Sequence, residues 1–127
     1  AEGVSTIHET VFENRFSYVK HLHKMGADIV FYSPEVHDPE TFYNFHWHQR
    51  IEGQHQAIRI IGPTYLHNAF VDMDDIRAGA TLILAALAAN GTSYLYQADI
   101  VDRGYEEIEE RLRMVGATIT RVKEDEV

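Results

Sequence analysis

Apolar residues recur along the chain at two spacings, one typical of strands and one typical of helices. Within residues 12–27, for example, Phe16, Val19 and Leu22 follow the three-to-four-residue spacing of a helix face. The pattern predicts strands over 5–12, 28–33, 92–101 and 118–122, with further strands around a Gly-Pro turn within 58–73. It predicts helices over 12–27, 74–91 and 102–117. This mixture predicts an α+β (mixed α/β) fold in which helices cover a mixed sheet.

The helix predicted over residues 74–91 is apolar almost all the way round after Arg77. Such a helix is typical of a protein interior, because it has no polar stripe to face water. We therefore expect it to be the most buried element of the chain. Its expected core residues are Leu82, Ile83, Leu84 and Leu87.

Residues 18–30 and 108–120, YVKHLHKMGADIV and IEERLRMVGATIT, share one pattern. Each has an aromatic or aliphatic residue, then Leu, then an apolar residue, then Gly-Ala-x-Ile. In both segments the pattern predicts a helix that stops at a glycine, Gly26 or Gly116, and leads directly into a strand. The pair suggests a repeated unit, although such helix-glycine-strand joints also occur in ordinary α/β proteins.

Length, composition and charge narrow the class of protein. The 127 residues fit one domain or part of a larger one, and no apolar run is long enough to cross a membrane. The net charge of -9 opposes nonspecific binding to nucleic acid and to anionic membranes, so we expect neither as a partner. There is no cysteine, which excludes disulfides and thiolate metal ligands. The first residues do not resemble a signal peptide, and we expect a cytoplasmic protein.

Three arginines, Arg15, Arg77 and Arg103, each fall before or within the first turn of a predicted helix. The helix dipole disfavours a cation there. Acidic neighbours such as Asp75 and Asp102 can cap the helix backbone without pairing with the arginines. Free N–H groups and an arginine fork together suit a phosphate or a carboxylate, so we predict a convergent anion site. Ordinary surface salt bridges are the alternative.

Residues 33–56 look like an insertion, with two of the three prolines and four of the eight histidines. His46 and His48, with His37 and His55, raise the alternative of a zinc or nickel site, because neutral imidazoles suit both metals. Tyrosine, phenylalanine and tryptophan beside the histidines instead favour an insertion that packs its aromatic rings on the domain. We therefore expect no metal and no cofactor.

Three stretches, in this order, resemble one enzyme family. They are ETVFENRF (9–16), DDIRAGATLILAALAANG (74–91) and DRGYEEIEERLRMVGATITRV (102–122). They are similar to the C-terminal part of the UDP-N-acetylglucosamine 1-carboxyvinyltransferase family, also called UDP-N-acetylglucosamine enolpyruvyl transferase. The resemblance covers residues 1–32 and 57–123. It implies repeated βαβαββ units in two globular domains that close over a substrate cleft, of which this chain would be the C-terminal part.

The resemblance also implies roles for individual residues. Asp75 and Arg77 match the family's Asp-Leu-Arg motif, and Arg103 matches the arginine of its Asp-Arg-Gly-Tyr-Glu motif. The implied catalytic residues are Asp75, Arg77 and Arg103. The implied substrate contacts are Val11 and Phe12 to the nucleotide sugar, and Arg15, Arg77 and Arg103 to anionic groups.

The implied reaction moves the enolpyruvyl group of phosphoenolpyruvate to the 3-hydroxyl of UDP-N-acetylglucosamine, a step of peptidoglycan precursor synthesis. The family's lysine and asparagine pair, its catalytic loop and its sugar-binding aspartate all precede the matched region. We therefore expect this chain to need the N-terminal part of the enzyme, in cis or in trans, and to be inactive alone. The alternatives are a related phosphoshikimate carboxyvinyltransferase, a non-catalytic anion-binding domain and a histidine-rich metal-binding module.

Overall fold

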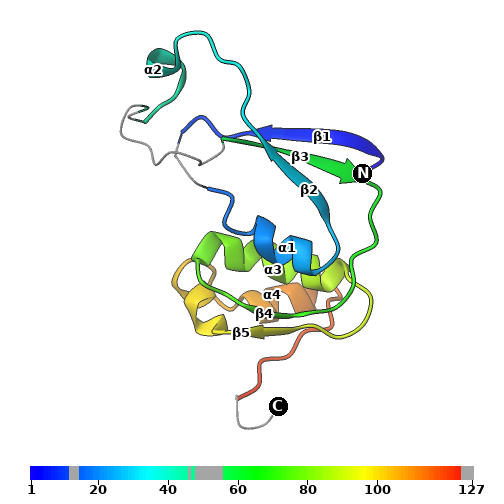
Figure 1. Cartoon of the computed structure of the whole chain (residues 1–127). Coiled ribbons are helices and arrows are strands. Elements are labelled where there is room, and N and C mark those ends of the chain that lie inside the picture. Colours follow the sequence, from blue (N-terminus) through cyan, green and yellow to red (C-terminus); the bar gives the residue numbers. More distant parts are fainter. Residues whose placement is uncertain (12–14, 46, 48–55, 124–127) are drawn as a thin grey trace. The chain divides into compact units, whose positions relative to one another are not determined.

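A computed structural model describes residues 1–11, 15–45, 47 and 56–123 (Figure 1). The chain divides into two compact units, Ala1–Tyr65 and Leu66–Val127. Both units combine helices with strands, which confirms the mixed α/β fold class. The helical elements that carry Arg77 and Arg103 both belong to the second unit.

The first unit is built on a three-stranded antiparallel sheet. Its strands are β1 (Gly3–His8), β2 (Asp28–Tyr32) and β3 (Ala57–Gly62), in the order β1-β3-β2. The strand predicted over 5–12 therefore begins and ends earlier than expected. Helix α1 (Val19–Lys24) leads into β2. The buried residues of this unit's core cluster are Phe16, Val19, Ile29 and Ile58.

Helix α1 is much shorter than the helix predicted over 12–27. Among the described residues of that range, 15–18 are not helical, and the amide of Val19 donates to the carbonyl of Phe16 at 3.1 Å. Phe16 is nevertheless only 6% exposed. The apolar spacing thus correctly indicates that Phe16 and Val19 share the core, but Phe16 lies in a turn before the helix and not in the helix itself.

The insertion packs aromatic rings against the end of β1. It contains the short helix α2 (Pro39–Phe42), followed by Tyr43, which is 4% exposed. The Tyr43 hydroxyl and His8 Nε2 share a hydrogen bond of 2.8 Å, and the Trp47 ring stacks on Tyr43 at 4.6 Å between centroids. The amide of Asn44 donates to the carbonyl of Thr10 at 2.7 Å. These contacts confirm the prediction that the insertion packs its aromatic residues on the chain.

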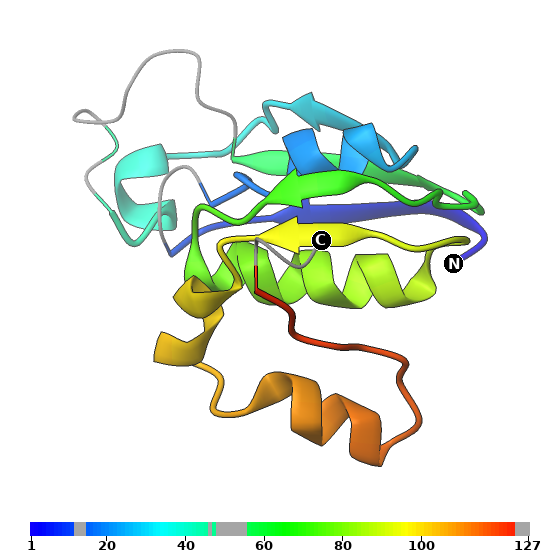
Figure 2. The ribbon, with the colours of Figure 1, turned by 90° about the horizontal axis from the view of Figure 1, so that it is seen from below.

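The second unit begins with a strand-helix-strand segment. Strands β4 (Phe70–Asp72) and β5 (Tyr94–Tyr96) are parallel, and helix α3 (Ile76–Ala88) connects them. Parallel strands require such a crossover, and Figure 2 shows α3 running alongside the two strands. The 3₁₀ helix η2 (Ala98–Arg103) and helix α4 (Ile108–Met114) follow. The largest fully buried side chains in the described part of this unit are Val71, Met73, Leu82 and Val101.

Several predicted boundaries in the second unit are wrong. The strand predicted over 92–101 ends at Tyr96, and the helix predicted over 102–117 forms only over Ile108–Met114. Gln97 and Glu107 have positive φ values of 61° and 48°, which interrupt the regular backbone at both places. The strand predicted over 118–122 is not formed, since residues 117–123 have no regular secondary structure.

Helix α3 is buried on one face only. Ala78, Gly79, Leu82 and Ile83 are buried, but Leu84 is 58% exposed and Leu87 is 36% exposed. The prediction that Leu84 belongs to the core is therefore wrong for this chain. A helix that is apolar all round needs packing partners all round, and the described part of the chain covers one side of α3.

The predicted repeat is confirmed at the two helix ends. Gly26 and Gly116 both have left-handed backbones, with φ of 97° and 104°. Glycine adopts this left-handed conformation without steric strain because it lacks a Cβ. The residue after each glycine donates to a leucine carbonyl five residues earlier, Ala27 to Leu22 and Ala117 to Leu112, both at 3.0 Å. This hydrogen-bond pattern is the Schellman motif that ends many helices.

Candidate functional site

Arg77 lies in the first turn of α3, as the sequence predicted. The helix begins at Ile76, and the Asp75 carboxylate accepts a hydrogen bond from the backbone amide of Arg77 at 3.2 Å. Asp75 is therefore the N-cap of α3, a role that an aspartate fills because its oxygen satisfies a free helix amide. The Arg77 side chain is exposed. The local sequence Asp-Ile-Arg thus fixes both the start of the helix and the position of the arginine.

Arg103 does not lie at the start of a helix, and that prediction is wrong. It is the last residue of η2, and the next helix begins only at Ile108. The carbonyl of Val101 accepts hydrogen bonds from the amides of Gly104 and Tyr105 at 3.1 and 3.0 Å, which turn the chain after Arg103. A cation at the C-terminal end of a helical segment is favoured by the backbone dipole, so the position suits an arginine. The Arg103 side chain is exposed.

Two glycines bring the segments of Arg77 and Arg103 together. A Cβ on Gly79 would lie 2.8 Å from Cγ2 of Val101, and a Cβ on Gly104 would lie 2.8 Å from Cγ2 of Ile76. No real Cβ atom tolerates such a distance, so the first turns of α3 and the end of η2 approach as closely as they do because both residues are glycine. Arg77 lies between Ile76 and Gly79, and Arg103 lies between Val101 and Gly104. The two arginines are therefore carried by directly packed backbone segments.

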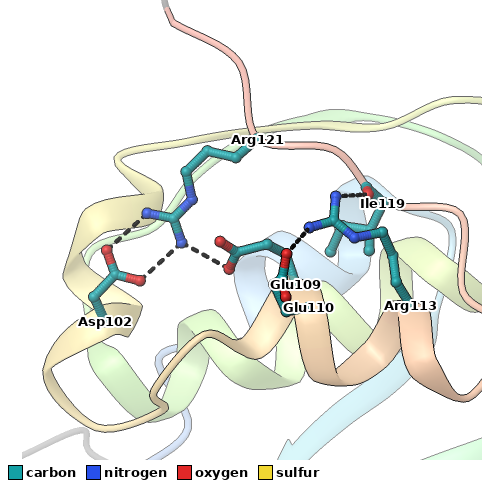
Figure 3. A network of polar contacts seen from close by, with 6 residues as sticks. All are labelled: Asp102, Glu109, Glu110, Arg113, Ile119 and Arg121. Atoms are coloured by element: carbon teal, nitrogen blue, oxygen red, sulfur yellow. Dashed lines mark hydrogen bonds and ion pairs between the residues drawn. The ribbon is translucent and has the colours of Figure 1, made fainter.

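The carboxylate beside Arg103 is bound by a different arginine. Arg121 donates two parallel hydrogen bonds to Asp102, from Nη1 at 2.7 Å and from Nη2 at 2.8 Å (Figure 3). Arg121 Nη2 also donates to Glu109 Oε2 at 3.0 Å. The hydrogen bonds from Arg121 hold the pKa of Asp102 below its usual value, and the same contacts raise the pKa of Arg121. This fork geometry is the strong form of an arginine–carboxylate pair.

The aspartates Asp75 and Asp102 are both bound by groups other than the Arg77 and Arg103 side chains. Asp75 is hydrogen-bonded to the helix backbone, and Asp102 is bound by Arg121. Within the described ranges of the chain, neither the Arg77 nor the Arg103 guanidinium forms an ion pair. Two exposed arginines on packed segments can bind a phosphate or a carboxylate with forked hydrogen bonds.

The other predicted substrate contacts lie in the first unit. Val11 is 44% exposed, Arg15 is partly exposed, and Phe12 lies outside the described residues. The stretch before them is held by backbone pairing, because Glu9 donates its amide to the carbonyl of Gln56 at 2.8 Å. The Gln56 side chain in turn donates to the carbonyl of Glu9 at 3.0 Å. The convergence of Arg15 with the other two arginines stays a prediction.

The described part of the chain contains neither a candidate metal centre nor a helix that could cross a membrane. Among residues 1–11, 15–45, 47 and 56–123, no group of three or more histidine, aspartate or glutamate side chains could hold a metal ion. Three of the histidines considered for such a site, His46, His48 and His55, lie outside the described residues. In the same part of the chain, no helix has the length and apolar character needed to cross a membrane.

Sequence reasoning missed the network around Arg121. The sequence pattern predicts a helix-capping role for Asp102, and it predicts a strand around Arg121 without any role for its side chain. The two residues are 19 positions apart, so no helix or strand spacing relates them. Only the alternation of acidic and basic residues over 102–121 hinted at ion pairs, and it did not identify the partners.

Comparison with known proteins decides the family. The model of EPSP synthase (3-phosphoshikimate 1-carboxyvinyltransferase) matches residues 1–112. The chain belongs to this family. The UDP-N-acetylglucosamine 1-carboxyvinyltransferase of Halothermothrix orenii is 43% identical over 123 residues, which are 97% of this chain and 24% of that protein. The enzyme of the same name from Acidobacterium capsulatum is 42% identical over 122 residues, or 96% of this chain and 23% of that protein.

A solved structure supports membership of the EPSP synthase family. The enolpyruvyl transferase NikO from Streptomyces tendae matches with a TM-score of 0.69 and 30% identity, covering 94% of this chain and 23% of that one. The resemblance to the C-terminal portion of the UDP-N-acetylglucosamine 1-carboxyvinyltransferases and the enolpyruvyl transferase fold are both confirmed. The chain spans about a quarter of the length of the curated relatives it matches.

Proposed function

We propose that this chain is part of an enolpyruvyl transferase and supplies anion ligands to its substrate site. In the intact enzyme, Arg77 and Arg103 bind the phosphate and carboxylate of phosphoenolpyruvate. The enolpyruvyl group then moves to the 3-hydroxyl of UDP-N-acetylglucosamine, a step of peptidoglycan precursor synthesis. Both substrates are charged metabolites that dissolve in the cytoplasm, which is where we place the enzyme.

One observation carries the proposal. The segments of Arg77 and Arg103 pack directly through Gly79 and Gly104, while Asp75 accepts from the backbone amide of Arg77 and Asp102 is bound by Arg121. An acidic chain with a net charge of -9 repels anions at long range, so an anion site has to be local and specific. Two exposed arginines on directly packed segments, with Asp75 and Asp102 bound by other groups, support such a site.

The proposed chemistry makes specific demands on these residues. The oxygen of the sugar 3-hydroxyl bonds to C2 of phosphoenolpyruvate, the C2–O bond to phosphate breaks, and phosphate leaves with the hydroxyl proton. Negative charge on the phosphate grows as this bond breaks, and a fixed arginine fork stabilises it without reorganisation. Asp75 is proposed to serve the site as the cap of α3, which holds the segment of Arg77.

The nucleotide sugar is assigned to the first unit. We propose that Val11 and Phe12 contact UDP-N-acetylglucosamine and that Arg15 is a further anion ligand. The exposure of Val11 and the backbone pairing of Glu9 with Gln56 support this assignment, because a ligand contact needs an accessible side chain on an ordered backbone. The remaining catalytic groups have to come from the part of the enzyme that this chain does not contain.

A second candidate is transfer to a phosphorylated shikimate. The description of the matching family model names 3-phosphoshikimate, which favours this acceptor. The relatives that share about 40% identity over nearly the whole chain carry the name of the UDP-N-acetylglucosamine enzyme, which favours the nucleotide sugar. The closer sequence relationship supports UDP-N-acetylglucosamine as the acceptor.

Acceptor-dependent phosphate release tests the proposal. The intact enzyme that contains this chain is mixed with phosphoenolpyruvate and either UDP-N-acetylglucosamine or shikimate 3-phosphate, and inorganic phosphate is measured over time. We expect release with UDP-N-acetylglucosamine only, and none from the isolated chain. Release with shikimate 3-phosphate only would replace the proposed acceptor. No release with either acceptor, together with phosphoenolpyruvate binding, would indicate the non-catalytic anion-binding domain.

A further inference from the structure

The fork between Arg121 and Asp102 links three segments of the second unit. Arg121 lies in the irregular segment after α4, Asp102 lies in η2, and Glu109 lies in the first turn of α4. Figure 3 shows the Arg121 guanidinium between the two carboxylates, with both hydrogen bonds to Asp102 and one to Glu109. The Glu109 side chain is only 18% exposed, so this network is more enclosed than an isolated surface pair.

The network acts on the backbone next to Arg103. On one side, Val101 is fully buried and contacts Gly79 of α3. On the other side, Gly104 lies against Ile76. Asp102, the residue directly before Arg103, is fixed from outside by Arg121. Arg103 is therefore flanked by three anchored neighbours, of which Asp102 is held by hydrogen bonds from the side chain of Arg121.

The fork also controls a competing charge. Asp102 is adjacent to Arg103 in the sequence, so its carboxylate is close enough to compete with a substrate anion for the Arg103 guanidinium. An ion pair between them would neutralise the arginine that the proposed function assigns to phosphoenolpyruvate. Arg121 binds both oxygens of Asp102 and balances its charge, which weakens the attraction of this carboxylate for Arg103.

We propose that Arg121 is a positioning residue for phosphoenolpyruvate binding, which holds Asp102 away from Arg103 and fixes the backbone that presents the Arg103 guanidinium. This inference rests on the proposed function of Arg103. It assigns a role in the site to a residue that touches no substrate. Its effect reaches the anion through Asp102.

The test compares kinetic constants of single variants in the intact enzyme. Arg121→Ala should raise KM for phosphoenolpyruvate roughly ten- to a hundredfold, because a misplaced binding group and a freed competing carboxylate both weaken the anion site. KM for UDP-N-acetylglucosamine should change less than about twofold, since that substrate is bound elsewhere. KM for phosphoenolpyruvate in Arg121→Lys should lie between the values of the wild type and of Arg121→Ala, because lysine keeps the charge and loses the forked hydrogen bonds. Should Arg121→Ala fail to fold, Arg121→Lys carries the same comparison.

A rescue variant separates positioning from general stabilisation. In the double variant Arg121→Ala with Asp102→Asn, no carboxylate remains beside Arg103, so part of the lost affinity for phosphoenolpyruvate should return. A purely structural role predicts no recovery, because both changes remove the same ion pair. Recovery supports the inference, and a KM equal to or above that of Arg121→Ala overturns it.

Arg113→Ala is the matched control. Arg113 ties the same irregular segment to α4, donating to the Ile119 carbonyl and to Glu110 Oε1, both at 3.2 Å, but it does not contact Asp102. Its loss should leave KM for phosphoenolpyruvate within about twofold of the wild-type value. Equal effects of Arg113→Ala and Arg121→Ala would overturn the inference. If Arg103→Ala itself leaves phosphoenolpyruvate binding unchanged, the proposed function fails first, which distinguishes the two failures.

Discussion

At the scale of single residues, the candidate site depends on which carboxylate binds which partner. Arg77 and Arg103 each follow an aspartate closely in the sequence, and in both cases that aspartate is bound by a group other than the arginine's own side chain. Asp75 accepts from a helix amide, and Asp102 accepts from Arg121. An arginine beside an acidic residue is usually explained as a surface salt bridge. Here the hydrogen-bond partners argue for two cations that remain available to an anion.

Arg103→Ala in the intact enzyme should lower the rate of enolpyruvyl transfer by roughly a hundredfold, or about 3 kcal/mol, because the transition state loses a forked cation. Arg103→Lys should restore part of the rate, since an ammonium keeps the charge and lacks the bidentate geometry. Steady-state phosphate release measures both effects.

The control for Arg103 is Arg111→Ala. Arg111 lies on the exposed side of α4, and its nearest carboxylate contact is Glu106 at 3.7 Å, with both side chains more than two-thirds exposed (69% and 83%). Its loss should barely change the rate. Equal losses for Arg103→Ala and Arg111→Ala would indicate general destabilisation in place of a site.

The pKa of Asp102 offers a test that needs no substrate. Because Arg121 lowers this pKa below the ordinary 3.8, the ion pair contributes to stability above that pH and is lost as the pH falls through the lower folded value. Carbon NMR of the side-chain carboxyl should therefore show Asp102 titrating at a lower pH in the wild type than in Arg121→Gln. Identical titration curves would contradict the fork in solution.

Among the elements, local signals in the sequence were sufficient for the C-terminal ends of α1 and α4 and insufficient for the strand predicted over 118–122. Gly26 and Gly116 were predicted to end helices, and both do so with the same hydrogen bonds, because a helix end is decided by neighbouring residues. The segment 118–122 matches β2 in the repeat but forms no strand. A strand requires a partner from elsewhere in the chain, and β2 has β3 at its side.

Only part of the site was predictable, because local signals in the sequence reveal helix starts but not contacts between distant residues. Arg77 and its cap Asp75 follow from a local helix-start signal. The place of Arg103 at the end of η2 follows from the turn that Gly104 and Tyr105 make on Val101, and α4 begins only after Glu107, whose positive φ is not encoded in any common turn signal. The close packing of Gly79 on Val101 and the fork of Arg121 join distant positions, so a single sequence does not reveal them.

The close approach of α3 and η2 leads to a prediction with an unusual sign. Replacing glycine by alanine inside a helix normally stabilises by roughly 0.5–1 kcal/mol. Gly79→Ala should instead destabilise by about 1–3 kcal/mol, because the new methyl group would overlap Val101. Urea denaturation measures the free energy of unfolding. Adding Val101→Ala should recover part of the loss, and a stabilised Gly79→Ala protein would contradict this packing.

At the scale of the whole molecule, this chain shows features of a part that functions within a longer protein. It spans about a quarter of the length of its curated relatives. Large apolar side chains are exposed on its second unit, including Phe70 at 56%, Leu84 at 58% and Met114 at 85%. Side chains of this kind suit packing against further protein, as a longer enzyme would provide.

Leu84 provides a direct test of this view. In the isolated chain, Leu84→Ala should change the free energy of unfolding by less than about 0.5 kcal/mol, because the side chain is mostly exposed. In the intact protein, the same change should cost about 2 kcal/mol or more, because the remaining chain would cover this face of α3. Reversible denaturation of both proteins gives the two values. A small cost in both would show that nothing covers the exposed face.

A double-mutant cycle in the intact enzyme tests whether Arg77 and Arg103 form one site for phosphoenolpyruvate. KM for phosphoenolpyruvate and kcat are measured for the wild type, for Arg77→Ala, for Arg103→Ala and for the double variant. If both arginines bind the same anion, the effects are coupled, and the double variant should lose clearly less than the product of the two single losses. Losses in kcat/KM that multiply independently, or no loss at either arginine, would contradict the account.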